Sequence, residues 1–194
     1  MVGKALITEN YDLAAWLYLT LPGPWESQEV LKLRKQIEQE GITREIINQI
    51  PPQLTVERKI ATAMFHQIRK HKLARVFGKD LINLMISAYQ SYLFNKILSR
   101  TIEHNLIDHN SPALPIPGNN IQVPAELDKI YHDVLRDEGI DKKRLPPGEE
   151  MRMPIENARE IKTKLLEEGI LIEFFLPKGC YATIFLREFL DIML

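Results

Sequence analysis

Apolar residues recur every three or four positions through most of the first hundred residues, which is the spacing of one face of a helix. Between interruptions by proline and glycine, this pattern predicts helices over residues 11–21, 28–40, 43–50, 55–77 and 81–100. Ser27 precedes the second helix and Gly41 follows it, and these residue types favour the two ends of a helix. The expected buried stripe of the first helix is Leu13, Trp16, Leu17 and Leu21.

The pattern changes between residues 104 and 154. Residues 109–124 contain four prolines and a glycine among apolar residues, so we expect a loop that packs on a surface. Residues 125–140 form an amphipathic pattern that predicts a helix ended by Gly139. Its expected apolar face is Leu127, Ile130, Tyr131, Val134 and Leu135. Residues 144–154 again have the composition of a loop.

Strand patterns are confined to the last forty residues. Residues 159–165 alternate between apolar and polar, residues 167–169 fit a turn, and residues 170–177 are almost wholly apolar. This order predicts an antiparallel hairpin. Residues 180–186 fit either a strand or a helix, because a short apolar run does not separate the two. The predicted fold class is therefore α+β, mostly helical, with a small antiparallel sheet near the C-terminus.

Composition narrows the class of protein. The 194 residues can form one domain or two small ones. The 25 lysines and arginines almost balance the 26 aspartates and glutamates, so any nucleic-acid surface must be a local patch. The single cysteine permits no internal disulfide and fits a reducing compartment. Because no apolar run approaches the roughly 20 residues of a membrane span, and no signal peptide is recognisable, we expect a soluble intracellular protein.

The longest basic segment runs from Arg58 to Lys79. It holds seven lysines and arginines and no acidic residue. Such a run fits contacts with phosphates, and it equally fits a solvated helix face. Lys70, Lys72 and Arg75 are its central candidates for RNA binding. Metal chemistry is not expected, because the five histidines lack the spacing of a helical zinc site, and Cys180 reads as a packed structural thiol.

A polar stripe crosses the otherwise apolar helix expected over residues 81–100. At 100° per residue, Ser87, Ser91 and Asn95 follow one row and Gln90 lies on its flank. A buried amide without partners costs about 1–3 kcal/mol. We therefore expect Gln90 and Asn95 to bind either the backbone of a neighbouring element or a ligand.

Two segments resemble a known family. Residues 88–100, AYQSYLFNKILSR, and residues 174–188, FFLPKGCYATIFLRE, resemble the two signature stretches of the TruD family of tRNA pseudouridine synthases in its archaeal form. The start of the chain and residues 126–140 resemble the family more weakly. The resemblance implies a helical insertion module over residues 1–155, followed by strands and a helix of the catalytic sheet over residues 156–194.

The resemblance also implies a function. The family isomerises a uridine of tRNA, chiefly at position 13, to pseudouridine, in the cytoplasm and without cofactor or metal. It implies that the substrate pocket or RNA is contacted by Arg159, Lys178, Tyr181, Thr183 and Arg187. It implies supporting roles for the signature residues Tyr89, Gln90, Ser91, Asn95, Leu176, Gly179 and Glu188. Arg187 is expected to pair with Glu188 or with a phosphate.

One departure from the family decides the expected activity. A family member carries its nucleophilic aspartate in a Gly-x-Lys-Asp motif upstream of the region matched here. The sequence Gly78-Lys79-Asp80 imitates that motif but lies just before the first signature, so Asp80 is expected to be a helix N-cap. We therefore expect a synthase that lacks its nucleophile-bearing half and is inactive alone. Truncation, a split gene and decay into a pseudoenzyme all fit the sequence, and the candidate protein partners are a separate N-terminal chain and a second copy. The alternatives are a non-catalytic RNA-binding module and a protein-interaction subunit.

Overall fold

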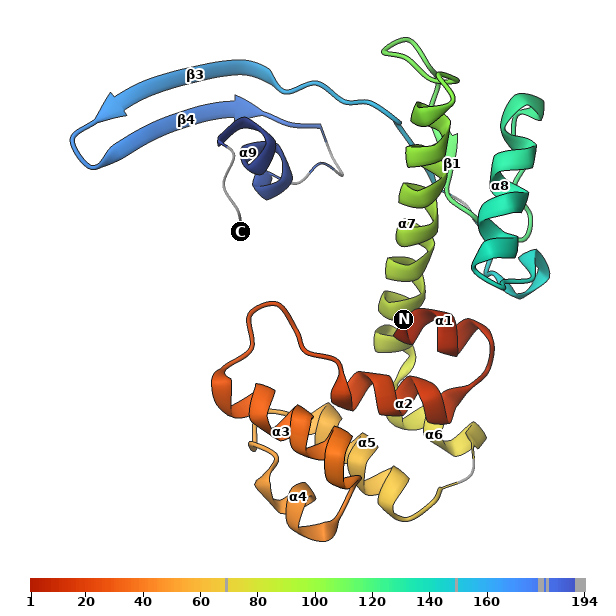
Figure 1. The fold of residues 1–194 in the computed structure, drawn as a ribbon, viewed down its shortest axis with the longest axis vertical. Helices are drawn as coiled ribbons and strands as arrows, with labels where there is room; N and C mark the ends of the chain where they lie inside the picture. Colours follow the sequence, from red (N-terminus) through yellow and green to blue (C-terminus); the bar gives the residue numbers. More distant parts are fainter. Residues whose placement is uncertain (69, 149, 178–179, 181, 191–194) are drawn as a thin grey trace.

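The structure, a computed structural model, describes residues 1–68, 70–148, 150–177, 180 and 182–190, without the side chains of residues 70, 71, 183 and 188–190. Its amino-terminal part consists of short helices joined by loops (Figure 1). They are α1 (Val2–Ile7), α2 (Tyr11–Thr20), α3 (Gln28–Glu40), α4 (Arg44–Gln49), α5 (Thr55–Phe65) and α6 (Lys70–Phe77). As predicted, the Ser27 hydroxyl accepts the Val30 amide at 3.3 Å, and Gly41, with φ 79°, ends α3.

The long helix α7 (Lys79–Glu103) connects two hydrophobic cores (Figure 1). Its first turns, from Leu81 to Ile86, pack against the core built by α1 to α6. Its later residues Leu93, Phe94 and Ile97 lie in the second core. Helix α1 crosses α7 at Gly3, where a Cβ atom would lie 2.1 Å from the Met85 carbonyl oxygen. The lack of a side chain at Gly3 therefore permits this close approach.

The second core lies between α7 and α8 (Ala125–Asp137). The five apolar residues predicted for the face of α8 are all buried, which confirms that prediction. Two short strands, β1 (Leu114–Pro115) and β2 (Met151–Arg152), pair antiparallel beside α7, and the 3₁₀ helix η1 (Lys142–Arg144) lies between α8 and β2. These strands lie in residues 109–124 and 144–154, which the sequence predicts to be loops. A two-residue strand is too short to produce a recognisable alternation.

The C-terminal part is a hairpin of β3 (Arg159–Leu166) and β4 (Gly169–Phe175), followed by α9 (Ala182–Leu190). The strands pair antiparallel, as predicted, and place Leu165 opposite Ile170. Residues 182–186, whose sequence fits either a strand or a helix, belong to the helix α9. Helix α9 covers one end of the hairpin, where the rings of Phe174 and Phe185 lie 4.8 Å apart. The fold is thus α+β, as expected.

Three predictions of local structure are wrong. The helix expected over residues 55–77 breaks at residues 66–68, where Gln67 has φ 50°. Asp80 does not cap α7, because the helix already begins at Lys79 and Gly78 is its N-cap. Of the buried stripe expected for the first helix, Leu13 and Leu21 are 43% and 41% exposed, whereas the buried residues of α2 are Ala14, Ala15 and Leu19. Those buried alanines, Ala14 and Ala15, let α2 pack closely against its neighbours α1, α5 and α6.

Candidate RNA-binding site

A cavity of about 630 Å³ lies on α7 where β2 and the segment leading into it pass alongside. We call it the α7 cavity. Its polar lining comes from one side of α7 and from residues 148, 150 and 152, so it combines two parts of the chain that are distant in sequence. The polar groups are contributed by Ser87, Gln90, Ser91, Gly148, Glu150 and Arg152. Hydroxyl, amide and guanidinium groups of this kind are able to bind the bases and phosphates of RNA.

Gln90 fixes one wall of the cavity. Its side chain is 8% exposed, and its Nε2 atom donates a hydrogen bond to the Pro117 carbonyl oxygen at 2.8 Å. The Tyr131 hydroxyl of α8 donates to the Pro115 carbonyl oxygen of the same segment at 2.7 Å. The proline-rich segment, residues 109–124, thus has carbonyl groups bound by both α7 and α8. Gln90 therefore has the backbone partner that its buried position predicts.

Arg152 provides the positive charge of the cavity. Its guanidinium group lies 5.4 Å from the centre of the Phe94 ring, and Nη2 donates weakly to the Ser91 hydroxyl at 3.5 Å. Among the residues that the structure describes, no carboxylate forms an ion pair with it. A guanidinium group held by a ring and a hydroxyl keeps further N–H donors for an incoming acceptor. Sequence reasoning missed Arg152, because a single arginine in a loop carries no pattern.

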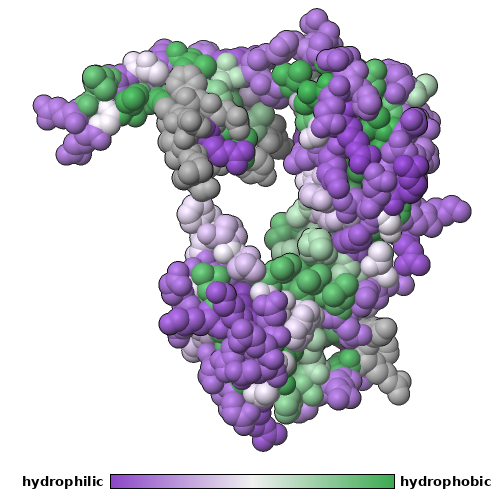
Figure 2. Space-filling model, viewed as in Figure 1, coloured by the Kyte–Doolittle hydropathy of each residue, from purple (hydrophilic) through white to green (hydrophobic). Residues whose placement is uncertain are grey.

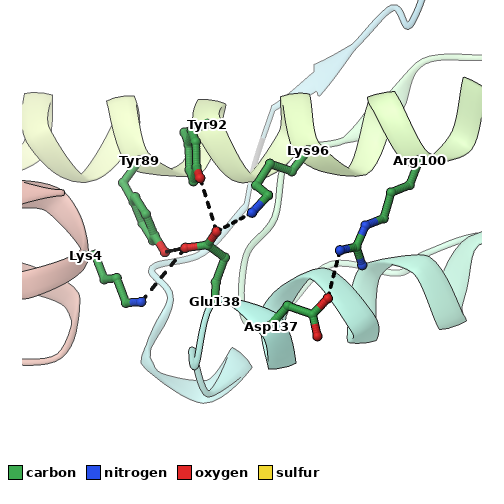
Figure 3. A network of polar contacts seen from close by, with 7 residues as sticks. All are labelled: Lys4, Tyr89, Tyr92, Lys96, Arg100, Asp137 and Glu138. Atoms are coloured by element: carbon green, nitrogen blue, oxygen red, sulfur yellow. Dashed lines mark hydrogen bonds and ion pairs between the residues drawn. The ribbon is translucent and has the colours of Figure 1, made fainter.

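A second polar cluster, centred on Glu138 at the end of α8, ties three helices together (Figure 3). The Glu138 carboxylate accepts hydrogen bonds from the Tyr89 hydroxyl at 3.0 Å, the Tyr92 hydroxyl at 3.2 Å and Lys96 Nζ at 2.6 Å. Lys4 Nζ of α1 lies 3.9 Å away. These contacts hold α1, α7 and α8 in a fixed arrangement around the second core.

The same cluster shifts the acidity of its members. Burial alone would raise the pKa of Glu138, but the hydrogen bonds from Lys96 and Tyr89 outweigh it and hold the pKa below its ordinary value. Burial and the neighbouring Glu138 carboxylate raise the pKa of Tyr89 well above its ordinary value. Tyr89 is therefore a hydrogen-bond donor to a carboxylate and is poorly placed to act as a base.

Comparisons with known proteins agree on the family. The family model described as tRNA pseudouridine synthase D (TruD) matches residues 1–112 and 107–189. The chain belongs to the TruD family. It is 33% identical to a tRNA pseudouridine synthase D of Saccharolobus solfataricus over 98% of the chain and 51% of the relative. The corresponding protein of Methanopyrus kandleri is 30% identical over 98% of the chain and 53% of the relative.

A solved structure supports the fold. The crystal structure of a TruD protein from Methanosarcina mazei superposes with a TM-score of 0.79 and covers 98% of this chain, at 22% sequence identity. The chain covers 57% of that structure. The chain thus spans about half the length of the TruD relatives that it matches.

The residues of the first TruD signature have different positions in the structure. Tyr89 and Gln90 are buried and bonded, and Ser91 lines the cavity. Asn95 is exposed on α7, so it is not the buried amide that the apolar pattern predicts, and its binding of a ligand stays a prediction. Position 95 lies five residues after Gln90, which places it about 140° further around α7, where the helix faces solvent.

The residues expected from the second TruD signature are partly outside the description. Lys178, Gly179 and Tyr181 are among the residues not described, as are the side chains of Lys70, Thr183 and Glu188. Leu176 is half-buried, and Arg159 and Arg187 are exposed on β3 and α9. Their roles in binding RNA stay predictions. Lys72 and Arg75 are exposed on α6 and do not line the α7 cavity.

Neither a metal site nor a membrane helix is found in the described part of the chain. Its histidine, cysteine, aspartate and glutamate side chains form no group of three that could hold a metal ion. Its helices are each too short or too polar to cross a membrane. Asp80 is exposed in the first turn of α7, where a carboxylate interacts favourably with the helix dipole.

Proposed function

We propose that this chain forms half of a tRNA pseudouridine synthase that converts a uridine of tRNA, chiefly at position 13, to pseudouridine. In this proposal residues 1–155 are the helical module and residues 156–194 complete the catalytic sheet. The nucleophilic aspartate comes from sequence outside residues 1–194, in the same or another chain. Residues 1–194 alone are then inactive.

This proposal rests on two quantities: how much of this chain the TruD family matches, and how much of its relatives' length the chain spans. The TruD match extends over nearly the whole chain, whereas the chain spans 51% and 53% of two curated relatives. The rest of each relative is thus available to supply the catalytic aspartate. Asp80 is a poor substitute, because it belongs to the first turn of the helix that carries the first signature.

The hairpin supports the proposal independently. Every residue of β3 is exposed, and Leu165 and Ile170, paired across the strands, are 81% and 59% exposed. Figure 2 shows hydrophobic residues exposed to solvent on this hairpin. A hairpin of two strands is marginally stable in water by itself. Further strands of a catalytic sheet would cover these residues.

The α7 cavity supports an RNA substrate. Arg152 and the serine hydroxyls are donors for phosphate or uracil oxygens, and the backbone around them is held by Gln90 and Tyr131. A uridine must leave the RNA stack before its base is isomerised, and the extruded nucleotide needs such fixed polar contacts. We assign the cavity to contacts with the RNA that surrounds this uridine.

Complementation tests the proposal. The purified chain, the amino-terminal half of the Saccharolobus solfataricus relative, and their mixture are each incubated with unmodified tRNA transcript, and pseudouridine is mapped by chemical labelling and primer extension. We expect conversion by the mixture alone. Robust conversion by the chain alone would show that its nucleophile lies within residues 1–194. A folded but inactive mixture would favour the non-catalytic alternatives.

A further inference from the structure

The exposed cations at the junction of α6 and α7 form a surface that the catalytic proposal leaves unused. Lys72 and Arg75 on α6, and Lys79 at the start of α7, are all exposed. We call these three residues the α6 surface. None of them lines the α7 cavity, so this surface is separate from the site described above.

The packing of α6 turns the side chains of Lys72 and Arg75 outward. Leu73 and Phe77, one turn apart, are 1% and 4% exposed and lie in the amino-terminal core. The Phe77 ring meets the Tyr18 ring edge-on, with 5.8 Å between their centres. Because residues three apart on a helix are neighbours, Lys72 and Arg75 project together from the opposite side. The surface is therefore held by the core and needs no rearrangement to meet a ligand.

The charge of the α6 surface is not neutralised within the described structure. Among the described residues, no ion pair or hydrogen bond involves the side chains of Lys72, Arg75 or Lys79. Residues 58–79 contain no acidic residue, and the exposed Asp80 that follows forms no ion pair with the three cations. The chain as a whole carries a net charge of −1, so this positive potential is a local feature. Arg58, at the start of the run, is excluded because its guanidinium group donates inward to the Ile50 carbonyl oxygen.

A row of phosphates fits this surface better than a single anion does. The three cations are spread over two helices and are exposed, so each can meet a different phosphate of one strand. Lysine acts on phosphate as a point charge, and arginine as a two-pronged donor. We propose that the α6 surface binds the phosphate backbone of the tRNA away from the reacting uridine. This inference rests on the proposed tRNA substrate.

The test uses the whole chain and an unmodified tRNA transcript. Binding is measured by filter retention at several salt concentrations for the wild type and for the variant K72Q/R75Q/K79Q. The control K32Q/R44Q/K129Q removes the same charges from exposed positions on α3, α4 and α8. Circular dichroism and thermal melting confirm that both variants are folded.

Each lost phosphate contact lowers the salt slope of log K by about 0.7–0.9. The variant should therefore have a slope smaller by about 2–3 and bind about a hundredfold more weakly at 0.1 M salt, whereas the control should bind like the wild type. Wild-type affinity and slope in the variant, or an equal loss in the control, would overturn the inference. So would a wild-type chain that does not bind tRNA.

These outcomes are separate from the fate of the proposed function. Pseudouridine formed by the mixed halves, together with an unaffected variant, would retain the enzyme and refute the α6 surface. Conversely, an inactive mixture with surface-dependent binding would refute the enzyme and retain the RNA contact. Binding and isomerisation are thus read from different measurements.

Discussion

Replacing Gln90 with alanine should loosen the second core. The Gln90 side chain is 8% exposed and donates to the Pro117 carbonyl oxygen at 2.8 Å. Without the amide, this carbonyl group stays buried and loses its donor, which costs about 1–3 kcal/mol of the free energy of unfolding. For a chain of this size, each kcal/mol lowers the melting temperature by about 2–4 °C.

The measurement is urea unfolding of the wild type, Gln90→Ala and the control Asn95→Ala. Asn95 lies on the same helix but is exposed, so its replacement should change the free energy of unfolding by less than about 0.5 kcal/mol. Hydrogen exchange should be faster at the amides of Leu114, Ile116 and Gly118 in Gln90→Ala alone. Equal unfolding free energies for the two variants would refute the role assigned to Gln90.

Three further predictions follow from the contacts. The pKa of Glu138 is lower in the folded chain than in the unfolded chain, where it is about 4.3. Glu138 therefore stabilises the fold above pH 4.3, and this stabilisation is lost as the pH falls through the folded pKa. Glu138→Gln should therefore be less stable at pH 7, with a flatter acid dependence in urea unfolding. Leu165→Lys combined with Ile170→Lys should leave the stability of the chain within about 0.5 kcal/mol but abolish complementation by the amino-terminal half. Arg152→Met keeps the contact with Phe94 but removes the donors, so conversion in the mixture should fall about tenfold or more.

The sequence predicts those parts of the fold in which periodicity and burial agree. In α8 the apolar face predicted from spacing is buried in full, and the C-terminal strands pair as the alternation indicates. In α2 the same reasoning fails, because Ala14 and Ala15 are buried through close packing of helices rather than through side-chain size. The prediction of one helix over residues 55–77 fails at Gln67 for another reason. A single residue with positive φ leaves no gap in the apolar pattern.

The candidate site was predictable only in part. The burial of Gln90 in an apolar helix indicates a required partner, and the structure supplies one. Its choice of Pro117 depends on how a loop 27 residues away folds back on α7, which spacing along the chain does not determine. The same applies to Arg152, whose place in the cavity depends on the pairing of β1 with β2.

Neighbouring residues of the first signature contact different elements around α7. Tyr89 points to the Glu138 cluster and Gln90 to the proline-rich segment. Ser87 and Ser91, one turn apart, line the α7 cavity together with residues 148, 150 and 152. Because successive helix positions are separated by 100°, any rotation of α7 that displaced Gln90 would also turn the serine row away from Arg152. The signature therefore couples the packing of the second core to the shape of the α7 cavity, and a substitution at Tyr89 should alter the cavity although Tyr89 does not line it.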